Sequence, residues 1–162
     1  MKKGLNIMLN YSKKHKPKYV KPDSVKELER MAMEAARIKH PTIPEYAIAP
    51  RKFRDDKAND LTKCIIEYIK LKQGFATRLN STGIYRNDIK KFVPNTQRKG
   101  MPDIFGLMNG LTLFIEVKIG YDKMSLDQGK VKNEAESNGA KYFIAKNFTD
   151  FKSWIDNLIN NE

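Results

Sequence analysis

The dipeptide Asn109–Gly110 lies between two short apolar runs, and it constrains the fold of this chain more than any other feature. The run before it covers residues 103–108, and the run after it covers residues 113–119. Asn-Gly is the strongest two-residue hairpin signal, because both positions of a type I′ turn need a positive φ. The sequence therefore predicts two adjacent antiparallel strands, with the start of the first beside the end of the second.

Helical and extended patterns surround this hairpin in a definite order. A helical pattern begins near Asn59 or Asp60 and ends at Gly74, a suitable C-terminal cap. A first strand follows over 75–79, and a polar stretch rich in Lys, Arg and Asn over 80–99 is expected to be a loop facing DNA. After the hairpin we expect a helix over 125–137, a strand over 142–145 and an amphipathic helix over 149–159. These patterns predict a single α/β domain over 58–162, in the order helix, three antiparallel strands, helix, strand, helix.

Residues 1–57 differ in charge from the rest of the chain and are expected to form a basic N-terminal extension. They carry 15 Lys or Arg and 7 Asp or Glu, which gives them two thirds of the excess positive charge. Ser24 and Glu27 have capping-box spacing, and apolar residues behind them predict a helix over 24–39. The apolar face of that helix either covers the core or pairs with a second subunit. The lysine-rich opening before it is either a tail that contacts phosphates or a solvated terminus.

The overall charge favours a polyanionic partner. With 31 Lys or Arg against 19 Asp or Glu, the formal net charge is +12. Nucleic acid is the first expectation and an anionic membrane the second, although basic composition also occurs for solubility alone. Cys64 is the only cysteine, which excludes an intramolecular disulfide. Because no signal-like or membrane-spanning run is found, we expect a cytoplasmic protein of a bacterial or phage-infected host cell, with no membrane partner.

Two carboxylates at the ends of the predicted hairpin indicate a metal site. Folding at the turn brings Asp103 near Glu116, and such a pair suits a hard cation such as Mg²⁺. Strand alternation places Lys118 on the same face as Glu116, where an ammonium group can meet a phosphate. The two histidines, His15 and His40, lie outside the predicted core, so a zinc site is not expected.

These residues, together with the helix that follows them, resemble the PD-(D/E)XK nuclease superfamily and, more closely, its VRR-NUC branch. Pro102 and Asp103 are similar to the PD element, and the triplet 116–118 is similar to the EXK element. Ser125, Leu126 and Gln128 resemble the Ser-Leu-x-x-Gln that opens the following helix in that branch. The resemblance covers 59–146. It implies a restriction-endonuclease-like α/β (α+β) core, with a mixed sheet of about four strands flanked by helices in α-β-β-β-α-β order.

The resemblance also implies roles for particular residues. Asp103, Glu116 and Val117 would hold Mg²⁺ or Mn²⁺, with Lys118 and Gln128 beside them. An acid from the first helix would join the site, and aligning the helix ending favours Asp60 over Glu67. The family has an Arg, an Asn, a Thr and a Gly after the first strand that would touch DNA, and the similar residues here are Arg78, Asn80, Thr82 and Gly83. Cations of the following loop would also touch DNA, namely Arg86, Arg98 and Lys99.

The leading hypothesis is a Mg²⁺- or Mn²⁺-dependent DNA endonuclease. By resemblance, it would act as a homodimer on branched or flapped DNA. It would either resolve junctions such as the Holliday junction or nick one DNA strand. Two alternatives stay open: a nucleic-acid binding module without activity, and a restriction-type enzyme that cuts a defined duplex sequence.

Overall fold

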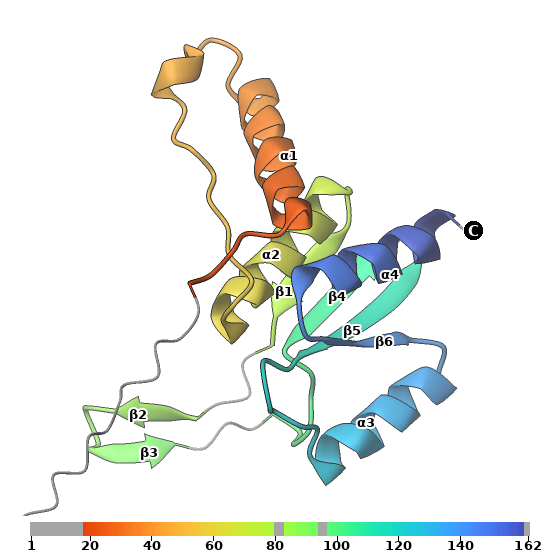
Figure 1. Ribbon diagram of the computed structural model, residues 1–162. Coiled ribbons are helices and arrows are strands. Elements are labelled where there is room, and N and C mark those ends of the chain that lie inside the picture. Colours follow the sequence, from red (N-terminus) through yellow and green to blue (C-terminus); the bar gives the residue numbers. More distant parts are fainter. Residues whose placement is uncertain (1–17, 80–82, 94–96, 161–162) are drawn as a thin grey trace, which may run out of the picture.

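The computed structural model describes residues 18–79, 83–93 and 97–160, and its centre is a four-stranded mixed sheet (Figure 1). The strands are β1 (Phe75–Arg78), β4 (Ile104–Met108), β5 (Leu111–Val117) and β6 (Lys141–Ala145), in the spatial order β1-β4-β5-β6. β1, β4 and β5 pair antiparallel, and β6 pairs parallel with β5. The parallel pair requires a crossover, which the helix between β5 and β6 supplies.

Helices cover both faces of this sheet. On one face lie α1 (Asp23–Lys39), α2 (Ala58–Leu71) and α4 (Phe148–Asn160), and on the other lies α3 (Leu126–Ser137) (Figure 1). A short 3-10 helix, η1 (Glu45–Ala47), follows α1. The expected fold class is confirmed: this is an α/β domain with a mixed four-stranded sheet flanked by helices.

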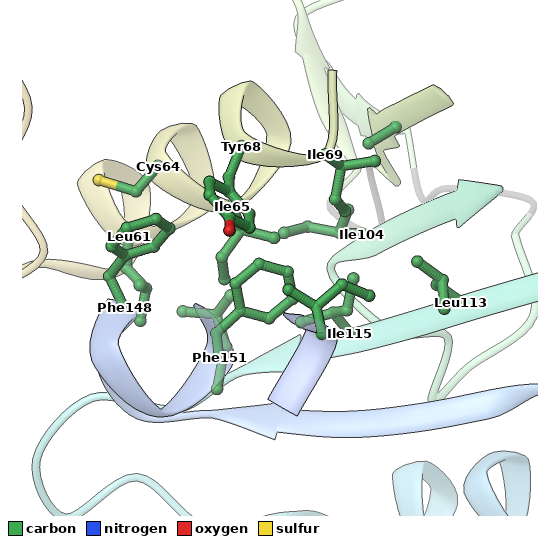
Figure 2. Close-up of a cluster of buried hydrophobic side chains, with 14 of the residues drawn as sticks. Leu61, Cys64, Ile65, Tyr68, Ile69, Ile104, Leu113, Ile115, Phe148 and Phe151 are labelled. Atoms are coloured by element: carbon green, nitrogen blue, oxygen red, sulfur yellow. The ribbon is translucent and has the colours of Figure 1, made fainter. Parts of the chain in front are cut away.

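The core forms where the apolar stripe of α2 meets the sheet and α4. Figure 2 shows Leu61, Ile65 and Ile69 above the strands that carry Ile104 and Ile115, and all five are fully buried. Aromatic rings close the cluster at its α4 end, where Tyr68 meets Phe148 and Phe151 edge-on. β4 alternates buried and partly exposed residues, and β5 does so as far as Ile115, so every second side chain lies on the face opposite this cluster.

Helix α1 covers the core. Val25 and Leu28 are fully buried in the same cluster as the α2 residues. Of the two roles that the sequence left open for this apolar face, the structure therefore shows intramolecular packing. The buried carboxylate of Asp55 links the segment before α1 to the start of α4. It accepts hydrogen bonds from the hydroxyl of Tyr19 (2.8 Å) and from the backbone N–H of Phe148 (3.1 Å). The lysine-rich opening at 1–17 lies outside the described residues.

One segment differs from its prediction. Within the expected loop 80–99, the structure has a hairpin of β2 (Ile84–Arg86) and β3 (Lys91–Val93) that projects away from the sheet (Figure 1). Each strand has three residues and charged neighbours, so neither produces a clear alternating pattern. Among the described helices, none is both long and apolar enough to cross a bilayer.

Candidate active site

The hairpin register places the two predicted carboxylates together. Ile104 pairs with Ile115, so Asp103, one residue before β4, lies opposite Glu116. The turn has the positive φ values that the sequence predicted, 48° at Asn109 and 75° at Gly110. A hydrogen bond fixes the junction, since the backbone N–H of Val117 donates to Asp103 Oδ2 (2.9 Å).

Glu116 and Lys118 are buried beside each other. Their side chains are 3% and 9% exposed, and Lys118 Nζ lies 3.0 Å from Glu116 Oε1. Asp122 adds a second carboxylate, with Oδ2 3.4 Å from the same ammonium group. Burial alone lowers the pKa of Lys118, but its contacts with Glu116 and Asp122 outweigh this and raise the pKa. The lysine therefore stays a cation at neutral pH.

Gln128 joins this group through the cap of α3. Ser125 is the N-cap residue, and its hydroxyl accepts from the backbone N–H of Gln128 (3.2 Å), while Gln128 Oε1 accepts from the backbone N–H of Ser125 (2.8 Å). This capping box fixes the amide, whose Nε2 donates to Glu116 Oε1 (2.5 Å). The Ser-x-x-Gln pattern thus both begins the helix and aims the amide at the carboxylate.

One oxygen of Glu116 lacks a partner among the described residues. Lys118 and Gln128 both contact Oε1, whereas Oε2 is buried without a hydrogen bond. Burial and the neighbouring Asp103 raise the pKa of Glu116. The hydroxyl of Tyr142 on β6 is likewise buried without a partner, and its pKa is raised by burial and by the charges of Glu116 and Asp103. An unpartnered buried acceptor costs about 1–3 kcal/mol, so this region favours an added cation.

The donor set fits a hard divalent cation. Asp103 and Glu116 offer carboxylate oxygens, and Val117 can offer only its backbone carbonyl, because its side chain is apolar and packs in the core. Mg²⁺ is commonly held by one or two carboxylates, with phosphate and water completing the octahedron. In the described part of the chain, no three His, Cys, Asp or Glu residues gather into a metal cluster. Two carboxylates and one carbonyl leave coordination positions open for other ligands.

Gly100 joins the segment before Asp103 to the start of α3. Its φ is +82°, and a Cβ built there would lie 2.4 Å from the carbonyl carbon and oxygen of Asp127 and 2.8 Å from the nitrogen of Gln128. A side chain has no room at this position. Arg98 strengthens the same junction, since its guanidinium donates to both carboxylate oxygens of Glu134 on α3 (3.0 and 2.5 Å).

Asp60 is not brought to the other candidate residues. It lies in the first turn of α2, its Oδ1 is 3.3 Å from Lys63 Nζ, and it lines a separate surface pocket of about 420 Å³. The other lining residues are mostly cationic or aromatic: Tyr19, Lys21, Lys52, Phe53, Arg54 and Lys63. Acidic residues are common in the first turn of a helix because the helix dipole favours them there, which explains Asp60 without catalysis.

The predicted nucleic-acid contacts have different surroundings. Arg78 is exposed at the end of β1, and Lys99 is exposed before the PD element. Arg86 on β2 is ion-paired with Asp88, and Arg98 is bound to Glu134 as described above. Asn80 and Thr82 lie outside the described residues.

Sequence reasoning missed two groups at this site, Asp122 and Tyr142. Asp122 follows Lys118 by four residues across a turn at Gly120, where φ is +63°. The glycine and the spacing were the available signal. Tyr142 faces the carboxylates only because β6 is parallel to β5, a pairing direction that local patterns do not fix.

No protein-family model matches the chain, and no curated protein matches it. A solved structure described as a VRR_NUC domain is similar in fold, with a TM-score of 0.48 and 21% sequence identity, over 61% of this chain and 94% of that chain.

Proposed function

We propose that this protein is a nuclease that hydrolyses DNA phosphodiester bonds with Mg²⁺ or Mn²⁺. In its finer form, the proposal is a homodimeric endonuclease that selects branched or flapped DNA. The net charge of +12 supports a nucleic-acid substrate.

The observation that carries this proposal is the buried, incompletely satisfied carboxylate of Glu116. A structural Glu–Lys pair would have both oxygens hydrogen-bonded, because unmet acceptors in a protein interior are costly. Here Oε2 has no partner among the described residues, and Asp103 lies across the strand pair from it. That arrangement leaves one carboxylate oxygen available to a cation beside Asp103.

Each residue of the site has a defined task in this reaction. Asp103 and Glu116, with the carbonyl of Val117, would hold the metal. When bound, the ion supplies Lewis-acid polarisation of a phosphate oxygen and acidifies a water molecule. Lys118 places a fixed positive charge beside Glu116, where it stabilises the negative charge that builds up on the phosphate. Gln128 holds Oε1 of Glu116 in position through the capping box.

The first experiment separates binding from cleavage at Lys118. Lys118→Met keeps the buried stem but removes the charge, and Lys118→Ala removes both. We expect both variants to bind DNA like the wild type and to lose cleavage in Mg²⁺. Lys141→Met, at an exposed lysine that begins β6, is the control and should cleave normally. Full cleavage by Lys118→Met would disprove the role of the ammonium group.

The second experiment defines the substrate. A labelled four-way junction, a flap, a nicked duplex and a plain duplex are incubated with the protein, with and without Mg²⁺. We expect Mg²⁺-dependent cleavage of the branched forms. Cutting of plain duplex at one sequence would indicate the restriction-type alternative, and binding of all forms without any cleavage would indicate the module without activity.

A further inference from the structure

The hairpin formed by β2 and β3 projects from the end of the sheet that carries the candidate site. Arg78, the last residue of β1, pairs with Ile104, and the backbone N–H of Leu79 donates to the carbonyl of Asp103 (2.8 Å). The chain therefore leaves for the hairpin beside Asp103, and it returns through Gly100 to the same residue.

One face of the hairpin carries two aromatic side chains. Tyr85 and Phe92 are direct cross-strand partners, so their side chains share a face. They are 57% and 63% exposed. Among the described elements, no helix or sheet strand packs extensively on the hairpin. Since an isolated two-stranded hairpin is only marginally stable, exposing two rings on it is unfavourable unless they contact a ligand.

The opposite face and the tip carry positive charge. Arg86 pairs directly with Lys91 across the strands, and like charges in that position repel each other. Asp88 neutralises Arg86, while Lys90 and Lys91 have no ion-pair partner within the described residues. Lys90 has a φ of +49°, a conformation in which Gly or Asn is the usual residue. The tip therefore carries a cation where local conformation favours an uncharged residue.

We propose that this hairpin binds unpaired nucleotides of a nucleic-acid strand. Bases stack on Tyr85 and Phe92, which share one face, and Lys90 at the tip contacts a phosphate. Aromatic platforms combined with cations are the usual means of holding single strands, whose bases are free to stack. The positive charge favours this partner over a second copy of a chain that itself carries +12. The statement that these nucleotides flank the cleaved bond rests on the proposed function. The binding of nucleotides by the hairpin does not depend on that function.

The test is single-strand binding without divalent ions, measured by fluorescence anisotropy with labelled oligo(dT) and a duplex of equal length. The double variant Tyr85→Leu with Phe92→Leu keeps apolar bulk but removes the rings. We expect it to bind oligo(dT) at least about tenfold more weakly, with a smaller change for duplex. The swap Tyr85→Phe with Phe92→Tyr keeps both rings and should bind normally. Tyr46→Leu, at a ring that is 92% exposed on η1, is the matched control and should have no effect.

A second variant tests the cationic tip and keeps the hairpin folded. Lys90→Gly suits the positive φ and removes the charge, so the hairpin is retained. We expect the slope of log affinity for oligo(dT) against log salt to fall by about 0.7, the value for one phosphate contact. Lys141→Gln, at an exposed lysine on β6, should leave the slope unchanged.

Two results would overturn this inference. One is oligo(dT) binding by the leucine double variant equal to that of wild type and Tyr46→Leu. The other is weaker binding by the leucine double variant together with loss of a dimer by light scattering, because the hairpin would then be an interface between copies. Failure of the proposed nuclease activity is distinguishable, because it appears as no cleavage by the wild type in Mg²⁺ and leaves this metal-free assay unaffected.

Discussion

Replacing Gly100 by alanine should disturb the candidate site without touching any charged group. The new Cβ would lie 2.4 Å from the backbone of Asp127, where ordinary contact begins at 3.4 Å. The start of α3 would have to move by about 1 Å, because helix backbone cannot yield locally as a flexible side chain can. Gln128 lies one residue further along and would move with it, which lengthens the 2.5 Å bond to Glu116.

The size of this effect follows from two contributions. A non-glycine residue in the left-handed region costs about 1–2 kcal/mol, and overpacking adds about 1–3 kcal/mol. Gly139→Ala provides the matched control, because its φ is +85° and a Cβ there meets nothing within 4 Å. We therefore expect Gly139→Ala to lower the free energy of unfolding by the backbone cost alone, and Gly100→Ala to lower it by the backbone cost and the overpacking cost together.

Urea unfolding measures these free energies, and single-turnover cleavage measures the site. A displacement of about 1 Å in a catalytic arrangement can cost about 100-fold in rate, so Gly100→Ala should cleave far more slowly than Gly139→Ala. The side-chain amide resonance of Gln128 should shift in Gly100→Ala only. If the two variants are equal in stability, rate and amide resonance, the contact between Gly100 and α3 does not position Gln128.

Three further predictions concern the fold around the site. Leu28→Ala should lower the free energy of unfolding by about 2–5 kcal/mol, since this side chain of α1 is fully buried in the core; a loss below about 1 kcal/mol in urea unfolding would show that α1 packs loosely. Ser125→Ala should cost about 1 kcal/mol and slow cleavage by freeing Gln128, while Ser125→Thr should retain both; equal behaviour of the two variants would disprove the role of the cap. Burial raises the pKa of the Cys64 thiol to about 12, so the stability that this thiol contributes should be complete below the ordinary thiol pKa of about 8.5 and should decline as the pH rises toward 12. Thiol reagents at pH 8 should modify Cys64 only as fast as the chain unfolds, and rapid modification of the folded protein would contradict its burial.

The sequence predicted the parts of the site that depend on local geometry. The Asn109–Gly110 turn fixed the register, and alternation along β5 separated the core residues from Glu116 and Lys118. The spacing of Ser125 and Gln128 predicted the start of α3. These are short-range properties, since turn conformation, strand pleat and helix capping each involve only a few neighbouring residues.

The remaining features depend on contacts between distant segments. Glu116 is almost fully buried and is contacted by Gln128 of α3, whereas alternation alone predicts a half-exposed strand face. The position of Tyr142 near Glu116 depends on the parallel pairing of β6 with β5, which no local pattern encodes. The β2–β3 hairpin was missed because its strands are too short to show periodicity.

Calorimetric titration of Mn²⁺ tests the central claim most directly, because it needs no assumption about the substrate. The wild type should bind the ion at one site, and Glu116→Gln, which keeps the shape but removes the charge, should bind it much more weakly. Glu134→Gln, at an acid on α3 that pairs only with Arg98 among the described residues, is the control and should bind like the wild type. Equal binding by Glu116→Gln and the wild type, or no binding by either, would contradict a metal site at Asp103 and Glu116.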